Sequence, residues 1–521
     1  MNVQNVAGSL DRIESAAREL RRIERLTLET ILKRAGITPL DHRQLDALFR
    51  GILTRAEWRA GLYGLQKKGF VTMLQKTWGD LLVIVPSNLF PALQQIWLPP
   101  LPVDSSQAAE SELLSIAEAG PGLSRQLFCL LAQIAKNGLP VTQKGTMHKK
   151  AVQLISAGIE LTDDALRPLH LKYANADACT DAFAFLFDFA LRAGFIGRET
   201  NRISIRPEGL AYWFRLSVAE LEREWYIRLL EWHPPDEAWL QHVAFAIRHI
   251  PKNVWFPASL LTQWADDAGL LDPSLPREEA NRRLLEWLSL FHALGWMDLG
   301  ETRRGPAFRW VIECRPAEEL ARQDAPNRQV YVQPDLEIIV PPDVSYAVRW
   351  ELESSADRIK SDQVDIYRLT PESVARAVEN GRSADGLIAF YSRHAKYGLP
   401  EQAAAAIREW AASSNRLQLQ EVSLLRCGSE RLAAEIKANP ALADYILEAV
   451  GNRDFIVQSR PSEAVRRELK RYGLKHISAA NRAAGESVGS FPPIPDDSGQ
   501  RLDPVFPQQG FVYSKSAVHI Y

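Results

Sequence analysis

Hydrophobic residues follow two different spacings in the first part of the chain. Residues 26–36 and 54–69 carry apolar side chains at every third or fourth position, which predicts two amphipathic helices. Residues 71–74 and 81–85 are short apolar runs with polar residues between them, which is typical of two paired strands. The pattern therefore predicts two helices followed by a two-stranded hairpin.

The same order recurs twice further along the chain. Helices are predicted over 124–137 and 180–193, with a hairpin after the second, and again over 260–268 and 278–294. The second helix of each copy ends at a glycine followed by an aromatic residue: Gly69-Phe70, Gly194-Phe195 and Gly295-Trp296. Glycine readily adopts the left-handed conformation that closes a helix. Helix, turn, helix and hairpin is the order of a winged helix, so three such modules are predicted.

The predicted fold is mainly α-helical with small β wings, formed by tandem winged-helix modules, and an α+β domain follows them. Residues 329–419 indicate that domain, because Val- and Ile-rich strands there precede a run of helices. The expected units are an N-terminal helix and winged helix over 1–100, a second module over 107–225, a third over 226–318, the α+β domain over 327–426, a small α/β extension over 427–483 and a flexible tail over 484–521.

Composition limits the classes of protein that fit this chain. Its 521 residues are 46% hydrophobic and 24% charged, with a net charge of -2, which argues against binding nucleic acid over the whole surface. The four cysteines lie far apart, so neither a disulfide framework nor a zinc site is expected. The sequence shows no signal peptide and no membrane-length apolar run, so we expect a cytoplasmic protein without a membrane partner.

Motifs of the common enzyme classes are missing from the sequence. The chain contains no Gly-Lys dipeptide, so it lacks the phosphate-binding loop of helicase motors. Asp236-Glu237-Ala238-Trp239 resembles a helicase acidic box, but Pro234 and Pro235 precede it and cannot form the strand that such a box needs. A helix start is expected there instead. We therefore expect no catalytic residues, no metal, no cofactor and no enzymatic activity of the chain's own.

Basic residues gather near elements that would face DNA in a winged helix. Residues 1–100 carry 14 Lys and Arg against 9 Asp and Glu, and further cations follow in the second module. The candidates for contacts with DNA phosphates are Arg55, Arg59, Lys67, Lys68, Lys144, Lys149, Lys150, Arg198 and Arg202. Basic residues are also common on solvated faces, and many winged helices bind only proteins. The modules are therefore interpreted either as contacting duplex DNA or as protein-interaction domains whose charges are solvated.

Several short motifs follow one another in residues 329–419. They are Val332-Gln333-Pro334-Asp335, Tyr367-Arg368-Leu369-Thr370 with Ser373 and Ala377 after it, Leu399-Pro400 with Gln402, and Leu417-Gln418-Leu419, which is predicted as a last strand. This run resembles the helicase-associated domain at the N-terminus of XPB-type superfamily 2 helicases, although Glu401 separates Pro400 from Gln402. Residues 427–476 look like the continuation found in bacterial proteins with this domain.

The resemblance implies an accessory protein that lacks the helicase motor. A non-catalytic subunit of transcription factor IIH has a similar order of winged helices and a domain that pairs with XPB, which is an analogy of domain order alone. We expect a protein of DNA repair or transcription-linked processing that docks an XPB-like helicase. A winged-helix transcription regulator and a scaffold without nucleic-acid contact remain alternatives.

The candidate docking residues lie in the motifs of that domain. They are Gln333, Asp335, Tyr367, Arg368, Thr370 and Ser373. Tyrosine and arginine are residue types that interfaces favour as anchors. In the alternative interpretation, Tyr367 and Leu369 alternate into the domain's own core and Arg368 is solvated.

Overall fold

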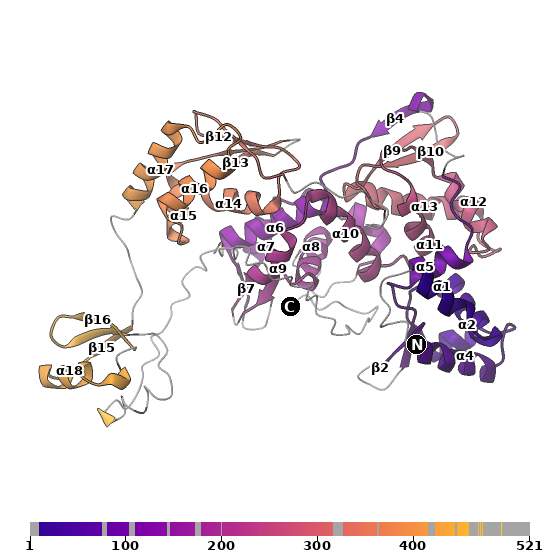
Figure 1. Ribbon diagram of the computed structural model, residues 1–521, viewed down its shortest axis with the longest axis horizontal. Helices are drawn as coiled ribbons and strands as arrows, with labels where there is room; N and C mark the ends of the chain where they lie inside the picture. The colour runs from indigo at the N-terminus through magenta and orange to yellow at the C-terminus, as the bar shows by residue number, and fades with distance from the viewer. Residues whose placement is uncertain are drawn as a thin grey trace.

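The computed structural model describes most of the chain (Figure 1). The described residues are 10–75, 81–103, 110–142, 146–171, 179–199, 201–315, 327–361, 364–414, 423–442 and 445–457, with the single residues Arg467, Leu469, Arg471, Tyr472 and Phe491. They form many helices and several small antiparallel sheets, so the fold is mixed α/β with helices predominating.

The N-terminal module begins with the helices that the sequence predicts. Its elements are α1 (Leu10–Arg18), α2 (Arg22–Ala35), β1 (Leu40–Asp41), α3 (His42–Leu48), α4 (Arg55–Lys68), β2 (Thr72–Gln75), β3 (Leu81–Ile84) and α5 (Phe90–Trp97). α4 begins at a capping box, in which Thr54 and Glu57 accept hydrogen bonds from each other's backbone amides. It ends at Gly69, whose φ of 82° is left-handed as expected.

The next two modules repeat this order of elements. The second has α6 (Leu123–Asn137), β5 (Leu139–Pro140), α7 (Lys149–Ser156), α8 (Asp181–Arg192), β6 (Ile196–Arg198) and β7 (Arg202–Ile205). The third has α11 (Ala238–Ala246), β8 (Phe256–Pro257), α12 (Ser259–Asp267), α13 (Arg277–Ala293), β9 (Met297–Thr302) and β10 (Gly305–Trp310). In all three modules the short first strand pairs with the last strand of the hairpin.

Three further elements connect or extend these modules. They are β4 (Leu113–Ala117), α9 (Pro207–Trp213) and α10 (Val218–Trp232). β4 pairs with β9 and extends the third sheet, whose order is β4-β9-β10-β8. Since α11 starts at Ala238, the Asp236-Glu237 pair precedes a helix and does not end a strand, as the prolines before it predict.

The α+β domain follows the three modules. Its elements are β11 (Tyr331–Val332), β12 (Glu337–Val340), α14 (Tyr346–Ser355), β13 (Asp357–Ser361), β14 (Asp365–Arg368), α15 (Pro371–Glu379), α16 (Ala384–His394) and α17 (Glu401–Ser414). The sheet order is β11-β12-β14-β13. The sequence predicts most of these elements but not α14 or β13, and its predicted strand over 417–419 lies outside the described residues.

A small unit lies beyond α17 and has its own hydrophobic core. It contains β15 (Ser423–Arg426), α18 (Glu430–Lys437), β16 (Ile446–Val450) and β17 (Asp454–Val457), with sheet order β15-β17-β16. Its core includes Phe455 and Leu442. The small unit is drawn apart from the other elements in Figure 1.

The hydrophobic core of the rest of the chain divides into two clusters that meet at α14. The first cluster runs through all three N-terminal modules, and the second lies within the α+β domain. Tyr346 and Trp350, one turn apart on α14, belong to the first cluster, whereas Val348 and Leu352 belong to the second. α14 therefore joins the α+β domain to the modules by burying two faces at once.

Buried polar side chains of α11 join the third module to the first. Gln241 Oε1 accepts a hydrogen bond from the Ile37 amide at 2.8 Å, and Gln241 Nε2 donates to the Pro235 carbonyl at 2.7 Å. His242 Nε2 lies 2.9 Å from the Leu32 carbonyl oxygen. Burial lowers the pKa of His242 to about 4, so its imidazole is neutral and Nε2 donates to that carbonyl.

A buried carboxyl group on α10 joins the second module to the third. Glu222 accepts hydrogen bonds from the Ser124 amide at 3.0 Å and from Trp296 Nε1 at 2.8 Å. Ser124 belongs to α6, and Trp296 precedes β9. Burial raises the pKa of Glu222 to about 7, even though these donors favour the charged form.

Replacing Glu222 with glutamine should change how stability depends on pH. The pKa of about 7 in the folded state lies above the usual value of 4.5. The folded protein thus holds this proton more tightly, and stability is lost as the pH rises between the two values. From pH 4.5 to 7.5 the wild type should lose up to about 3 kcal/mol relative to Glu222→Gln.

Urea unfolding at several pH values measures this difference. Glu208→Gln, at an exposed position on α9, is the matched control and should follow the wild type. Parallel profiles for the wild type and Glu222→Gln would contradict the raised pKa.

Candidate DNA-contact and docking surfaces

The exposed face of α4 brings together two of the predicted DNA-contact residues. The opposite face packs so closely on α2 that a Cβ added at Gly61 would meet Thr27 Oγ1 at 2.2 Å. Because α4 is held in this orientation, Arg59, Tyr63 and Lys67 lie one turn apart on the solvent side. The Lys67 ammonium lies 4.4 Å from the centre of the Tyr63 ring, so the face presents two cations beside an exposed aromatic ring.

The other two candidates on α4 have carboxylate partners within the module, whereas Arg59 Nη2 lies 2.6 Å from His42 Nε2. Arg55 Nε donates to Asp46 Oδ1 at 3.0 Å. Lys68 Nζ forms a 2.7 Å ion pair with the buried Glu24 of α2. Lys68 therefore helps to hold α4 on α2, and Arg59 and Lys67 are the candidates whose positions suit phosphate contacts.

The corresponding helix of the second module is buried. Residues 182–190 of α8 are all buried, because apolar side chains cover nearly every side of this helix. The Phe189 ring lies 5.5 Å from Trp225 and 4.7 Å from Trp232 of α10, centre to centre. α8 cannot enter a DNA groove in this structure.

The remaining basic candidates of the second module lie away from α8. Arg202 forms a 2.7 Å ion pair with Glu199, and Arg198 is exposed at the end of β6. Lys149 and Lys150 are exposed in the first turn of α7. Lys144 lies outside the described residues. The structure therefore does not gather these cations with Arg59 and Lys67 on one helix face.

The corresponding helix of the third module, α13, has an exposed face, but the arginines on that face pair with acidic residues. It packs against the short turn Asp164–Leu169 of the second module. Arg282 and Arg283 both pair with Glu279, at 2.6 Å and 2.8 Å. Among the three equivalent helices, α4 thus has the exposed basic face.

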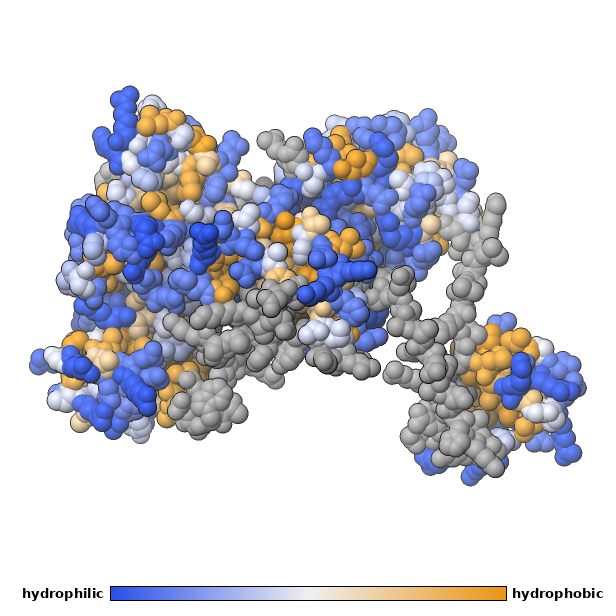
Figure 2. Space-filling model, turned by 180° about the vertical axis from the view of Figure 1, so that it is seen from behind, coloured by the Kyte–Doolittle hydropathy of each residue, from blue (hydrophilic) through white to orange (hydrophobic). Residues whose placement is uncertain are grey.

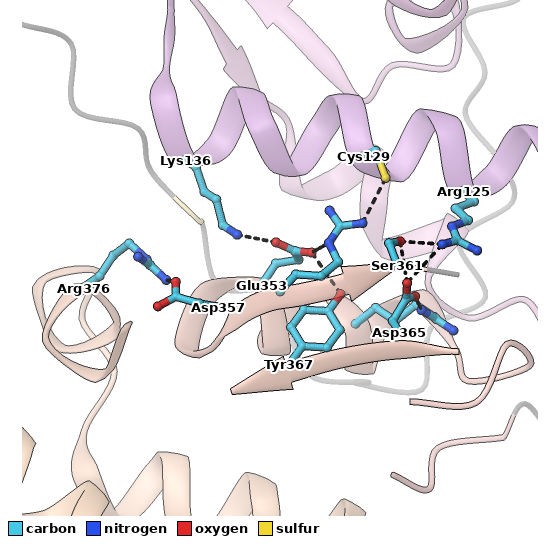
Figure 3. Close-up of polar contacts among 11 residues, drawn as sticks. Arg125, Cys129, Lys136, Glu353, Asp357, Ser361, Asp365, Tyr367 and Arg376 are labelled. Atoms are coloured by element: carbon cyan, nitrogen blue, oxygen red, sulfur yellow. Dashed lines mark hydrogen bonds and ion pairs between the residues drawn. The ribbon is translucent and has the colours of Figure 1, made fainter. Parts of the chain in front are cut away.

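The α+β domain contacts the second module through a buried polar cluster (Figure 3). Glu353 of α14 is 0% exposed, and Lys136 of α6 forms an ion pair with it. Arg358 Nε lies 2.9 Å from Glu353 Oε1, and the Tyr367 hydroxyl donates to the same oxygen at 2.9 Å. These donors compensate for the removal of the carboxylate from water.

A second carboxylate in this cluster also receives a cation from α6. Asp365 of β14 pairs with the neighbouring Arg349 and accepts a hydrogen bond from Arg125 of α6 at 3.2 Å. Ser361 Oγ donates to Asp365 at 2.7 Å. Figure 3 shows Arg125 and Lys136 reaching from α6 towards the sheet of the α+β domain. α6 therefore supplies two cations to buried carboxylates of that domain.

The predicted docking residue Tyr367 belongs to this cluster and is fully buried. Burial raises the pKa of Tyr367 well above its usual value, so the hydroxyl stays a neutral donor. The side chain is therefore inaccessible to a partner, and the alternative interpretation describes it better. Arg368, its neighbour, is half exposed and pairs with Glu337 on the adjacent strand.

The other four docking candidates shape local structure. Thr370 and Ser373 form the capping box that begins α15. The Asp335 carboxylate accepts a hydrogen bond from the Glu337 amide at 3.2 Å, and the Gln333 amide donates to the Glu337 carbonyl at 2.8 Å, which together set the β11–β12 turn. The motif residues thus have local structural partners, and none forms an exposed apolar anchor.

An exposed apolar surface on the small unit escaped the sequence analysis. Leu424, Leu447 and Val450 are 48%, 63% and 45% exposed, and hydrophobic residues cover much of this unit's visible face in Figure 2. Leu424 lies opposite Ile456 in the sheet. Phe455, the neighbour of Ile456 along β17, belongs to the core, so Leu424 and Ile456 lie on the opposite, outer face. We call the outer face of β15-β17-β16, with Leu447, the small-unit face. In the sequence, only the alternation of side chains between the two faces of these strands could have indicated the small-unit face.

The described residues hold no obvious metal site. Within them, no three His, Cys, Asp or Glu side chains converge as metal ligands would. None of the helices that the structure describes combines the length and apolar character needed to cross a membrane.

A comparison with protein families identifies the region that contains these docking candidates. A family model for a helicase conserved C-terminal domain matches residues 330–451, which span the α+β domain and most of the small unit. No curated protein matches the chain. The match supports a helicase-related protein, which is coarser than the XPB-type resemblance that the sequence motifs indicate.

Replacing Glu353 with glutamine should weaken the contact between the α+β domain and the second module. It would leave Lys136 and Arg358 without a counter-charge at a buried site, at a cost of about 3–5 kcal/mol. Urea unfolding measures the loss. Glu14→Gln is the control, because its partner Arg18 is exposed and the expected loss is below about 1 kcal/mol. Equal losses for the two variants would contradict the role of Glu353.

Proposed function

We propose that this protein is a non-enzymatic helicase-associated factor that docks an XPB-like helicase and contacts duplex DNA through its first module. The family match over residues 330–451 is the observation that carries the helicase part of this proposal. The chain has no Gly-Lys dipeptide and hence no P-loop, so ATP hydrolysis would come from the partner. A role in DNA repair or transcription-linked processing would follow.

The DNA part rests on the shared architecture of the modules. In each, a short strand lies between two helices and pairs with the last strand of the hairpin, which is the order expected of a winged helix. In a winged helix the helix just before the hairpin, here α4, would enter the major groove. Its exposed Arg59 and Lys67 would contact phosphates, and the small exposed residues Ala56 and Ala60 leave room for close approach.

The helicase contact would use the small-unit face. Exposed apolar residues on a sheet face are typical of protein interfaces, and the exposed leucines there supply such a patch. Of the motif residues, Tyr367 would act indirectly, since its hydroxyl donates to Glu353 in the cluster that holds the α+β domain on the second module. The two proposed contacts thus lie on different parts of the chain.

Reversing the charge of the α4 face should weaken DNA binding. Arg59→Glu with Lys67→Glu should lower affinity for a 20-bp duplex at least about tenfold and reduce the slope of log K against log salt by about two. Fluorescence anisotropy at several salt concentrations measures both. Arg431→Glu, at a 91% exposed side chain in the small unit, is a control of the same charge type.

Two outcomes would separate the alternatives. Unchanged binding in the α4 double variant would overturn the DNA role and favour a scaffold. Strong preference for one sequence among random duplexes would favour a transcription regulator.

The full chain should co-purify with an XPB-type helicase of the same organism and raise its ATPase activity. Leu424→Glu with Leu447→Glu should weaken this association at least about tenfold, because two charges would be buried in an apolar interface. Leu114→Glu, at a similarly exposed leucine of β4, is the control. No association of the wild type at micromolar concentration would refute the docking proposal.

A further inference from the structure

Phe491 lies far along the sequence from the residues that bury it. It is 1% exposed and belongs to the first hydrophobic cluster. Its ring lies 4.9 Å from the Trp350 ring of α14, centre to centre, at an angle of 61°. This is the edge-to-face geometry that aromatic pairs prefer.

A main-chain hydrogen bond fixes the same residue. The Phe491 carbonyl oxygen accepts a hydrogen bond from Arg382 Nη1 at 3.0 Å. The other two nitrogens of that guanidinium donate to the Glu351 carboxylate, both at 3.0 Å. Glu351 therefore orients Arg382 so that Nη1 donates to the Phe491 carbonyl at 3.0 Å and to the Asn380 carbonyl at 3.5 Å.

The surface that receives Phe491 is built from buried aromatic side chains. Trp350 is 0% exposed, and its ring lies 5.8 Å from Phe214 and 6.3 Å from Phe128 of the second module. The floor therefore belongs to the core in which the modules and the α+β domain meet. Arg382, between α15 and α16, forms one wall.

We propose that Trp350 and Arg382 form a docking pocket for an aromatic residue of an extended peptide, and that this chain's own Phe491 occupies it. The pocket combines an aromatic floor with a donor aimed at the peptide carbonyl. In the sequence, Pro492 and Pro493 follow Phe491, a composition typical of ligands that bind in extended form. This inference is independent of the proposed helicase and DNA contacts.

Docking of Phe491 would attach the small unit at both ends. The chain leaves the α+β domain after α17 and returns to that domain's edge at Phe491. A tethered ligand has an effective concentration in the millimolar range, so a modest pocket would stay occupied. Release of Phe491 would leave the small unit on one connection and open the pocket.

Peptide binding to the full chain tests the proposal. The probe is a fluorescein-labelled peptide of residues 485–498, and the proteins are wild type, Phe491→Ala and Phe511→Ala as the matched tail control. The peptide should bind Phe491→Ala about tenfold or more tighter than the wild type or the control, because the native segment competes in both. A peptide carrying alanine in place of Phe491 should not bind, and adding Arg382→Lys to Phe491→Ala should weaken binding.

Three results would overturn the proposal. They are equal peptide binding by wild type and Phe491→Ala, no binding by Phe491→Ala, and binding that survives loss of the peptide's phenylalanine. Phe491→Leu replaces Phe491→Ala if the alanine variant does not fold. Sedimentation at several concentrations checks the occupant: a dimer that Phe491→Ala abolishes would assign the pocket to a second copy and contradict occupancy within one chain.

Discussion

The burial of α14 on two faces is the constraint on which the arrangement of the chain depends. Tyr346 and Trp350 pack with the N-terminal modules, and Val348 and Leu352 pack inside the α+β domain. The same helix carries Glu353, which a lysine of α6 neutralises. Apolar packing holds the two parts together, and the buried charges favour one relative placement, because any other would leave a carboxylate without its donors.

The same principle of shared burial explains the distribution of exposed charge. The modules resemble one another in element order, yet they are stacked into one core, so the equivalent helix α8 is covered by its neighbours. The exposed arginines of α13 are paired with carboxylates instead. α4 lies in the first module, which joins the third through Gln241 and His242 of α11 and keeps its own outer face open. A near-neutral chain can therefore present one basic helix face.

Local structure was largely predictable from the sequence. The helix-ending Gly69 is where the sequence places it, and Thr54 and Thr370 cap α4 and α15. Such residues are readable from sequence because they act through backbone amides and φ angles of adjacent residues. α14 was missed because a helix that buries two faces lacks the simple one-sided spacing of apolar residues. Tyr367 was expected at a surface, but its neighbours Glu353 and Lys136 are distant in sequence and bury it.

The sequence by itself determined the order of helices and hairpins, the absence of a P-loop and the helicase-related motifs of residues 329–419. These features depend on residues close together along the chain. Only the tertiary structure decided which basic residues reach solvent, why Tyr367 is internal, and where Phe491 lies. Accessibility is a property of packing between segments that are far apart in sequence, so one buried helix or one lysine from α6 can change the role of a residue that local pattern alone would place at the surface.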